Sequence, residues 1–222
     1  LGLFQPVADA VKILVKELIM PAKGDRLVHW IAPIIMFFGV FMIFAVLPIG
    51  NGRMGVFADL NIGILYVVAI SSLAIIGIFM AGWASNSKFS LIGAMRAVAQ
   101  LISYEVPMVL SIVGVVLIVG SLQMSEIVGK QTIPFILLQP LGFLIYFIGA
   151  ITELNRSPMD MIEADSEIVA GYFTEYSGMK FAMFYLAEYI NTLTVSIIIT
   201  TLFLSGWKGP FLPVWLWFVL KV

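Results

Sequence analysis

Six carboxylic acids are crowded into residues 152–178, a polar stretch between two apolar segments. The 222-residue chain has only thirteen acids, and Arg156 is the one cation in this stretch before Lys180. Because like charges at close range resist simultaneous ionisation, some of these groups are expected to hold protons near neutral pH. We interpret the stretch as a loop that couples proton movement to a neighbouring event. The acids are Glu153, Asp160, Glu163, Asp165, Glu167 and Glu175.

The spacing inside this stretch indicates local order. Asp160, Glu163 and Glu167 fall at i, i+3 and i+7, which places them on one face of a helix. Pro158 suits the start of such a helix, and Gly171 suits a turn after it. The alternative is a solvated linker, which needs no ordered acidic face.

Acids also occur where the chain is otherwise apolar. Glu105 and Glu188 lie inside otherwise apolar spans, and Asp59 lies at the edge of one. A charge at the centre of a bilayer costs about 2.5–3.5 kcal/mol or more, so such residues usually face a bundle interior or a wet cavity. We interpret the three as proton-exchange sites. The alternative is a neutral carboxyl that is hydrogen-bonded between helices.

The composition is that of a membrane protein. Hydrophobic residues make up 61% of the chain and charged residues 11%. A membrane helix needs about 20 apolar residues, and at least five uncharged runs are long enough. We therefore predict an all-α, polytopic transmembrane helix bundle. The runs cover 30–52, 60–87, 106–125, 131–152, 189–207 and 209–220.

Several kinds of site are excluded by what the chain lacks. The net charge of −1 argues against nucleic acid as a partner. Without cysteine, the chain can build no disulfide, thiolate zinc site or iron–sulfur cluster. A single histidine, His29, cannot supply both axial ligands of a bis-histidine haem. Any electron carrier is therefore expected on another subunit.

The first 28 residues are predicted to form an amphipathic helix in the membrane interface, bounded by Pro6 and Pro21. The alternative is a helix packed on a soluble partner. Its apolar stripe would be Val7, Val11, Leu14, Val15 and Leu18, opposite Asp9, Lys12 and Lys16.

The rest of the chain divides into spans and one polar loop. Residues 29–151 are predicted to hold four transmembrane helices, at about 30–48, 60–81, 101–120 and 134–151, with a loop over 82–100. The acidic loop covers 152–180. Residues 181–222 hold one full span, to about 204, and one incomplete span from about 211.

The basic residues predict the orientation. If the spans alternate, nine lysines and arginines fall on one side and three on the other. The positive-inside rule makes the first side cytoplasmic, or the matrix side in a mitochondrion. The amphipathic helix, the 82–100 loop and the acidic loop share that face, as a docking surface would require.

The motifs together resemble those of the quinone-chamber membrane subunit of respiratory complex I, which is called the H subunit in bacteria and subunit 1 in mitochondria. The stretch T-E-L-N-R-S-P-M-D-M-I-E-A-D-S-E-I-V-A-G is similar to the family's acidic-loop signature, and T-E-Y-S-G follows it. Further similar motifs occur in the family's order at residues 2–6, 58–63, 82–88, 96–105 and 186–189.

The resemblance implies roles for particular residues. Members of the family form much of a quinone-access chamber, and their acids begin a proton route. Arg156 would order the loop by pairing with its acids. Residues near the quinone access would be Gln5, Asp9, Lys12, Asp25 and Arg26. The relay or coupling residues would be Asp59, Glu105, Glu153, Asp160, Glu163, Glu167, Glu175 and Glu188.

The resemblance also implies partners and a place in the cell. Quinone is expected as a substrate, with no iron–sulfur cluster, haem or flavin on this chain. Soluble subunits carrying iron–sulfur clusters would dock on the cytoplasmic or matrix face, beside other membrane-arm subunits. We expect the cytoplasmic membrane of a prokaryote, with the mitochondrial inner membrane or the thylakoid as alternatives. Members of the family have about eight membrane helices, so the family's first helix and its C-terminal end are expected to be absent here.

The chain departs from the family pattern at Thr152, Ser157, Met159 and Ile162, while Asp165 keeps the charge of a usual glutamate. Because of these departures, the sequence does not identify the electron donor or the type of quinone. Related complexes use reduced deazaflavin or ferredoxin as donors, reduce methanophenazine, or evolve hydrogen. A stand-alone transporter is a further alternative, although the halves show no self-similarity.

An integral-membrane prenyltransferase is another alternative from a different class. Such enzymes hold magnesium on a diphosphate with aspartates spaced four apart. Asn155, Asp160 and Asp165 are spaced five apart, which disfavours that reading.

Overall fold

The computed structural model describes residues 2, 4–50, 57–156, 159, 170–209 and 213–222. Every regular element in these residues is a helix, which confirms the all-α prediction. A helix satisfies its own backbone hydrogen bonds, as a hydrocarbon environment requires. Four helices are long and apolar enough to cross a membrane: α2 (Arg26–Phe44), α3 (Gly63–Ala84), α4 (Lys88–Val119) and α9 (Gly178–Phe203).

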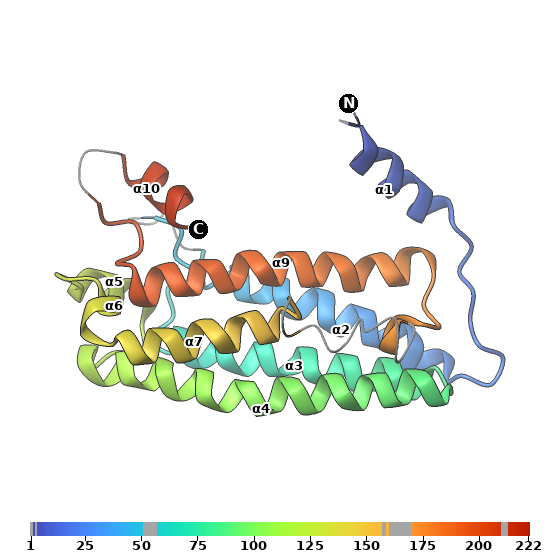
Figure 1. The fold of residues 1–222 in the computed structure, drawn as a ribbon. Coiled ribbons are helices and arrows are strands. Elements are labelled where there is room, and N and C mark those ends of the chain that lie inside the picture. The colour runs from blue at the N-terminus through green and yellow to red at the C-terminus, as the bar shows by residue number, and fades with distance from the viewer. Residues whose placement is uncertain (1, 3, 51–56, 157–158, 160–169, 210–212) are drawn as a thin grey trace.

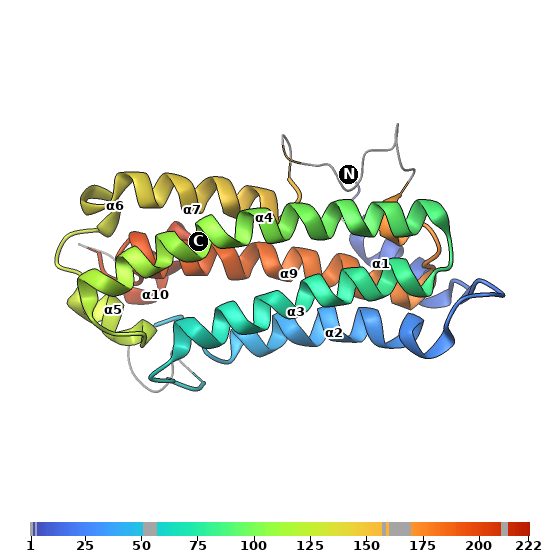
Figure 2. The same ribbon diagram turned by 90° about the horizontal axis from the view of Figure 1, so that it is seen from below.

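The long helices lie side by side along a common direction (Figures 1 and 2). A shorter apolar helix, α7 (Pro140–Glu153), runs with them and packs mainly against α4. Helix α2 packs against both α3 and α9, so the five helices enclose a common interior.

The bundle has two distinct ends. The inner end, which we define by its basic residues, holds the α1–α2 connection, the α3–α4 turn and the 3-10 turn η1 (Gly171–Phe173). Helix α1 (Gln5–Val15) lies at the edge of the bundle, where it contacts α9, and its apolar face is exposed (Figure 1). At the outer end lie three short helices: α5 (Met124–Lys130), α6 (Phe135–Leu138) and α10 (Val214–Lys221). The orientation prediction counted Lys221 on the opposite, basic side, and this is wrong, because its ammonium bonds carbonyl oxygens just beyond the C-terminus of α9.

The prediction of a loop over residues 82–100 is wrong. Helix α3 continues to Ala84, a three-residue turn follows, and α4 is helical from Lys88. The 32 residues of α4 span about 48 Å, well beyond a hydrocarbon core of about 30 Å. Lys88 and Arg96 can therefore belong to the helix, because its first turns need not lie in the hydrocarbon.

Two further boundaries differ from expectation. The segment predicted as one span over 134–151 is divided into α6 and α7 at Gln139, whose φ of −131° and ψ of 62° are not helical. Pro140 restricts the residue before it and lacks the N–H that would continue α6. Helix α1 ends at Val15, six residues before Pro21, and an extended segment connects it to α2.

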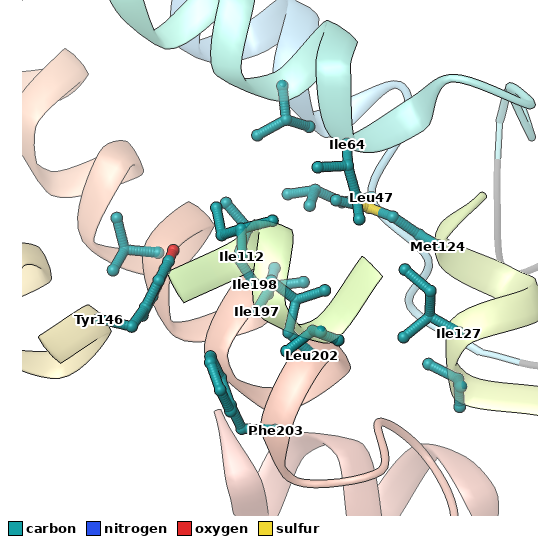
Figure 3. Close-up of a cluster of buried hydrophobic side chains, with 14 of the residues drawn as sticks. Leu47, Ile64, Ile112, Met124, Ile127, Tyr146, Ile197, Ile198, Leu202 and Phe203 are labelled. Carbon is teal, nitrogen blue, oxygen red and sulfur yellow. The ribbon is translucent and has the colours of Figure 1, made fainter. Parts of the chain in front are cut away.

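The buried side chains form two hydrophobic clusters. One lies in the outer half and includes Leu47, Ile127 and Phe203 (Figure 3). The other lies in the inner half and includes Ala32, Ala94, Tyr172, Phe173 and Phe184. The inner cluster joins the long helices to η1, so the end of the acidic stretch is part of the packed core. The outer cluster is completed by residues such as Ile64, Ile112, Met124, Tyr146, Ile197, Ile198 and Leu202.

Glycines bring backbones into close contact at the inner end. A Cβ added to Gly82 would come within 2.2 Å of the Ala94 Cβ, and one added to Gly93 would come within 2.7 Å of the Gly171 Cα. Small residues at such crossings let membrane helices approach closely. Helix α4 is thereby held against both α3 and η1.

A cavity lined by three glutamates

A cavity of about 60 Å³ lies inside the bundle, and its lining includes residues of both hydrophobic clusters. Three of its lining residues are acids from three helices: Glu105 on α4, Glu153 at the end of α7, and Glu188 on α9. Most of the remaining lining is apolar, with Met36 and Met108 on its walls. The structure thus brings together three of the predicted relay residues that are 35 to 83 positions apart in the sequence.

Two of these carboxyls have polar partners on neighbouring helices. The Ser72 hydroxyl on α3 hydrogen-bonds the carboxyl of Glu105. The Asn191 side-chain amide on α9 donates to Glu153 Oε1 over 3.5 Å. Glu153 also interacts electrostatically with Glu105. The positions of the Glu105 and Glu153 carboxyls are therefore fixed by hydrogen bonds to neighbouring helices.

The contact of Ser72 suits either charge state of Glu105. Its hydroxyl lies 3.1 Å from the Val68 carbonyl oxygen and also contacts Glu105. A hydroxyl has one proton to donate and can accept as well. It can donate to an ionised Glu105, or donate to Val68 while a protonated Glu105 donates to it. Neither state leaves a buried polar atom without a partner.

A second cavity of about 30 Å³ adjoins the first and shares Ser71, Glu105, Glu153 and Asn191 with it. It extends among residues of the outer cluster, where Tyr146 and other side chains line it. Glu105 and Glu153 therefore stand in the wall common to both cavities. A proton at either carboxyl therefore has a cavity on both sides.

The size of these cavities limits what they can hold. About 10–15 Å³ of probe-occupied volume accommodates one water, so both cavities have room for water. Sites for drug-sized ligands are about 300–1,000 Å³, so the glutamate cavity is too small for a quinone ring with its substituents. Among the described residues, no cluster of three or more His, Asp or Glu could hold a metal ion.

Both ends of the acidic stretch are anchored on α4. Gln100 Nε2 donates to the carbonyl oxygens of Thr152, over 3.3 Å, and Met159, over 2.9 Å. Nearer the start of α4, Ser90 Oγ donates to the Tyr172 carbonyl oxygen over 3.3 Å. Helix α4 thus carries Glu105 and also positions the two ends of the stretch.

Asp59 and Glu175 do not line either cavity. Asp59 Oδ2 accepts hydrogen bonds of 2.7 Å from Gln123 Nε2 and from Ser125 Oγ, which tie the start of α3 to α5 at the outer end. Glu175 lies between η1 and α9, at the inner end. The structure does not bring these two acids to the three glutamates, and their relay roles stay predictions.

Three of the predicted relay residues belong to a part of the acidic stretch that the structure does not describe. Asp160, Glu163 and Glu167 lie outside the described residues. Arg156 is exposed, and its guanidinium carbon lies 5.4 Å from the centroid of the Tyr189 ring on α9. This cation–π contact is a tie between the stretch and α9 that sequence reasoning did not foresee.

The predicted quinone-access residues all lie at the inner end or on α1, away from the glutamate cavity. Gln5 and Asp9 hydrogen-bond each other over 3.3 Å on α1, which also carries Lys12. Asp25 caps α2 by accepting from the N–H groups of the second and third helical residues, and Arg26 begins that helix. Their proximity to a quinone stays a prediction.

Sequence reasoning missed the neutral polar residues of the cavity. Ser71, Tyr104, Asn155 and Asn191 line it beside the glutamates. A signal was present, because Ser71 and Ser72 interrupt an apolar span and Asn191 follows Glu188 by three positions. That spacing places Asn191 and Glu188 on one face of α9.

Comparison with known proteins identifies relatives over the whole chain. The family model for NADH dehydrogenase matches residues 1–222. The H subunit of the NADH-quinone oxidoreductase of Dehalococcoides mccartyi is 58% identical over 221 residues, which are 100% of this chain and 62% of that protein. The corresponding H subunits of Carboxydothermus hydrogenoformans and Protochlamydia amoebophila are each 50% identical, with 100% of this chain and 64% and 70% of their lengths aligned.

The chain therefore spans 62% to 70% of the length of these relatives. The match extends over its helices, its glutamate cavity and its acidic stretch, and it confirms the resemblance inferred from the motifs. The chain belongs to the NADH dehydrogenase family.

Proposed function

We propose that this chain is a membrane subunit of a proton-translocating NADH-quinone oxidoreductase, in which it couples quinone reduction to proton movement. The observation that carries the proposal is the meeting of Glu105, Glu153 and Glu188 on one water-sized cavity in an apolar bundle. Relatives named as the H subunit of such an oxidoreductase support the assignment to a larger complex.

The proposed mechanism is electrostatic. Carboxyls that share an apolar cavity do not ionise independently, because each charge changes the cost of the next. A redox event at the inner end that changes the charge of the acidic stretch changes the proton occupancy of the cavity. Helix α4 transmits this bias because it anchors the stretch through Gln100 and carries Glu105 five residues further on.

The quinone itself is assigned to a separate chamber at the inner end. The glutamate cavity is too small for it, and the predicted access residues lie on α1 and at the start of α2. That chamber would be closed by soluble subunits bearing iron–sulfur clusters and by other membrane subunits, since this chain has no cysteine. The complex would reside in the cytoplasmic membrane of a prokaryote. The relatives' names favour NADH as the donor over the related donors considered above.

The experiment uses the full-length protein in its assembled complex. Glu105→Gln, Glu153→Gln and Glu188→Gln should each lower donor-to-quinone turnover and the associated proton translocation. Glu126→Gln is the matched control, because Glu126 is exposed at the outer end and pairs with Lys130 at 3.7 Å. Normal turnover and normal proton translocation in all three cavity variants would refute the proposal. So would an isolated chain that moves protons without a redox partner.

A further inference from the structure

Two buried basic side chains at the inner end have no hydrogen-bond partner in the described part of the chain. His29 on α2 is fully buried, and neither ring nitrogen is hydrogen-bonded. Lys180 on α9 is 2% exposed, and its ammonium makes no hydrogen bond. Buried polar groups are nearly always satisfied, so each exception points to a missing partner.

His29 and Lys180 interact electrostatically with each other, and their other immediate neighbours are aromatic. The Tyr176 ring stacks on His29, with centroids 4.0 Å apart and 17° between the planes. The Lys180 ammonium lies 4.0 Å from the centroid of Trp30. A desolvated cation–π contact contributes about 2 kcal/mol, less than the several kcal/mol that burying an ion costs. The Trp30 ring therefore compensates Lys180 only in part.

The electrostatic setting favours a negative charge here. The helices α2 and α9 both begin at this site, and helix N-termini attract anions. Asp25 already accepts two backbone hydrogen bonds as the cap of α2. Burial raises the pKa of the Tyr176 hydroxyl above its ordinary value, so Tyr176 stays neutral. Arg26 adds a further positive charge at the start of α2.

The Trp30 ring, which covers the Lys180 ammonium, faces outward from the bundle. Trp30 is 46% exposed, and Leu27 and Ile34 are exposed on the same helix. Their spacing of i, i+3 and i+7 forms one apolar stripe on α2. Trp30 lies in the second turn of a membrane-spanning helix, the depth at which tryptophan is enriched at the bilayer boundary. A ligand that reaches Lys180 past Trp30 therefore comes from the lipid side.

We propose that Lys180 and His29 form a binding site for the phosphate of an anionic phospholipid of the inner leaflet, with Trp30 as its movable cover. The phosphate accepts hydrogen bonds from the Lys180 ammonium and a His29 ring N–H. The acyl chains lie along Leu27 and Ile34. Basic pockets between membrane helices on the cytoplasmic side are suited to such headgroups. A free phosphate would gain nothing from the apolar stripe, which is why the lipid is favoured.

The test measures bound lipid in the assembled complex with the full-length protein. Phospholipids retained after purification are counted by mass spectrometry for the wild type, Lys180→Met, Lys180→Arg and the control Lys88→Gln, which removes an exposed cation from the same end. Lys180→Met should retain one anionic phospholipid fewer per complex and bind it about fivefold more weakly or worse. Lys180→Arg and Lys88→Gln should keep it. An unchanged count in Lys180→Met would overturn the proposal.

A second measurement needs no change at Lys180. Delipidated wild-type complex is titrated with anionic phospholipid, zwitterionic phospholipid or inorganic phosphate, and tryptophan fluorescence is followed. Anionic lipid alone should give a saturable change that is absent in Trp30→Phe. Equal responses to both lipids, or a response to inorganic phosphate alone, would contradict a site for an anionic lipid.

Discussion

Ser72 on α3 and Glu105 on α4 share a hydrogen bond in the interior of the bundle, and the same serine hydroxyl lies 3.1 Å from the Val68 carbonyl oxygen. The serine can donate to either acceptor, so it can follow Glu105 through a change of charge. A membrane carboxyl with an adaptable partner can change its proton occupancy without leaving a buried group unsatisfied.

The first prediction concerns this contact. Ser72→Ala should slow coupled proton translocation several-fold, because the ionised form of Glu105 loses a donor worth about 1.5–3 kcal/mol. Ser111→Ala is the matched control, since within the described residues the Ser111 hydroxyl bonds its own helix, at the Met108 carbonyl oxygen. Both rates are measured in membrane vesicles. Equal rates in the two variants would show that the Ser72 contact has no part in coupling.

The second prediction concerns the packing of α4 on η1. Gly93→Ala should destabilise the protein by about 1–3 kcal/mol, because the new Cβ would meet backbone atoms of Gly171 and Tyr172 that cannot rotate away. Gly129→Ala has open space around its Cβ and should leave stability unchanged or slightly raised. Thermal unfolding of the purified complexes checks both. A Gly93→Ala protein as stable as the wild type would mean that α4 and η1 do not pack this closely.

The third prediction concerns the anchor of the acidic stretch. Gln100→Ala removes the donor to the Thr152 and Met159 carbonyl oxygens, so hydrogen exchange should accelerate in the peptide that contains them. Gln123→Ala removes a comparable amide that instead contacts Asp59 at the outer end. Exchange in the 152–159 peptide should not respond to that change. Identical exchange in both variants would argue against an anchoring role for Gln100.

The fourth prediction concerns the outer end. The Lys221 ammonium donates to the carbonyl oxygens of Leu204, Gly206 and Lys208 at 2.7–2.9 Å, just beyond the C-terminus of α9. Lys221→Met should lower the free energy of unfolding by about 1–3 kcal/mol while coupling in the surviving complex is normal. Lys130→Met removes an exposed ion pair with Glu126 and a single hydrogen bond of 3.2 Å to the Val119 carbonyl oxygen, so it should cost less than Lys221→Met, about 1 kcal/mol or below. Equal stability of the two variants would contradict this capping role.

Much of the fold follows from composition and periodicity. Long apolar runs predict membrane helices, and their internal acids predict a buried polar site, so Glu105 and Glu188 could be selected from the sequence alone. The helix boundaries follow less well. A lysine and an arginine at positions 88 and 96 suggested a loop, but helix α4 is long enough to carry both charges beyond the hydrocarbon.

The partners of the glutamates could not be predicted from sequence. Glu153 meets Glu105 only because α7 packs against α4, and that packing depends on the break at Gln139 and on side-chain shape. Asp59 is an acid that the fold keeps away from the three cavity glutamates. It shares the sequence signature of an acid beside a span, yet its partners Gln123 and Ser125 place it at the outer end.

The central claim is that cavity carboxyls change their proton occupancy when the neighbouring redox centre changes its charge. Redox-triggered infrared difference spectroscopy of the assembled complex observes carboxyl protonation directly. A carboxyl C=O band should appear or vanish when the quinone is reduced, and this signal should be lost in Glu153→Gln but kept in Glu126→Gln. A difference spectrum in which Glu105→Gln, Glu153→Gln and Glu188→Gln all leave the carboxyl region unchanged would contradict the claim.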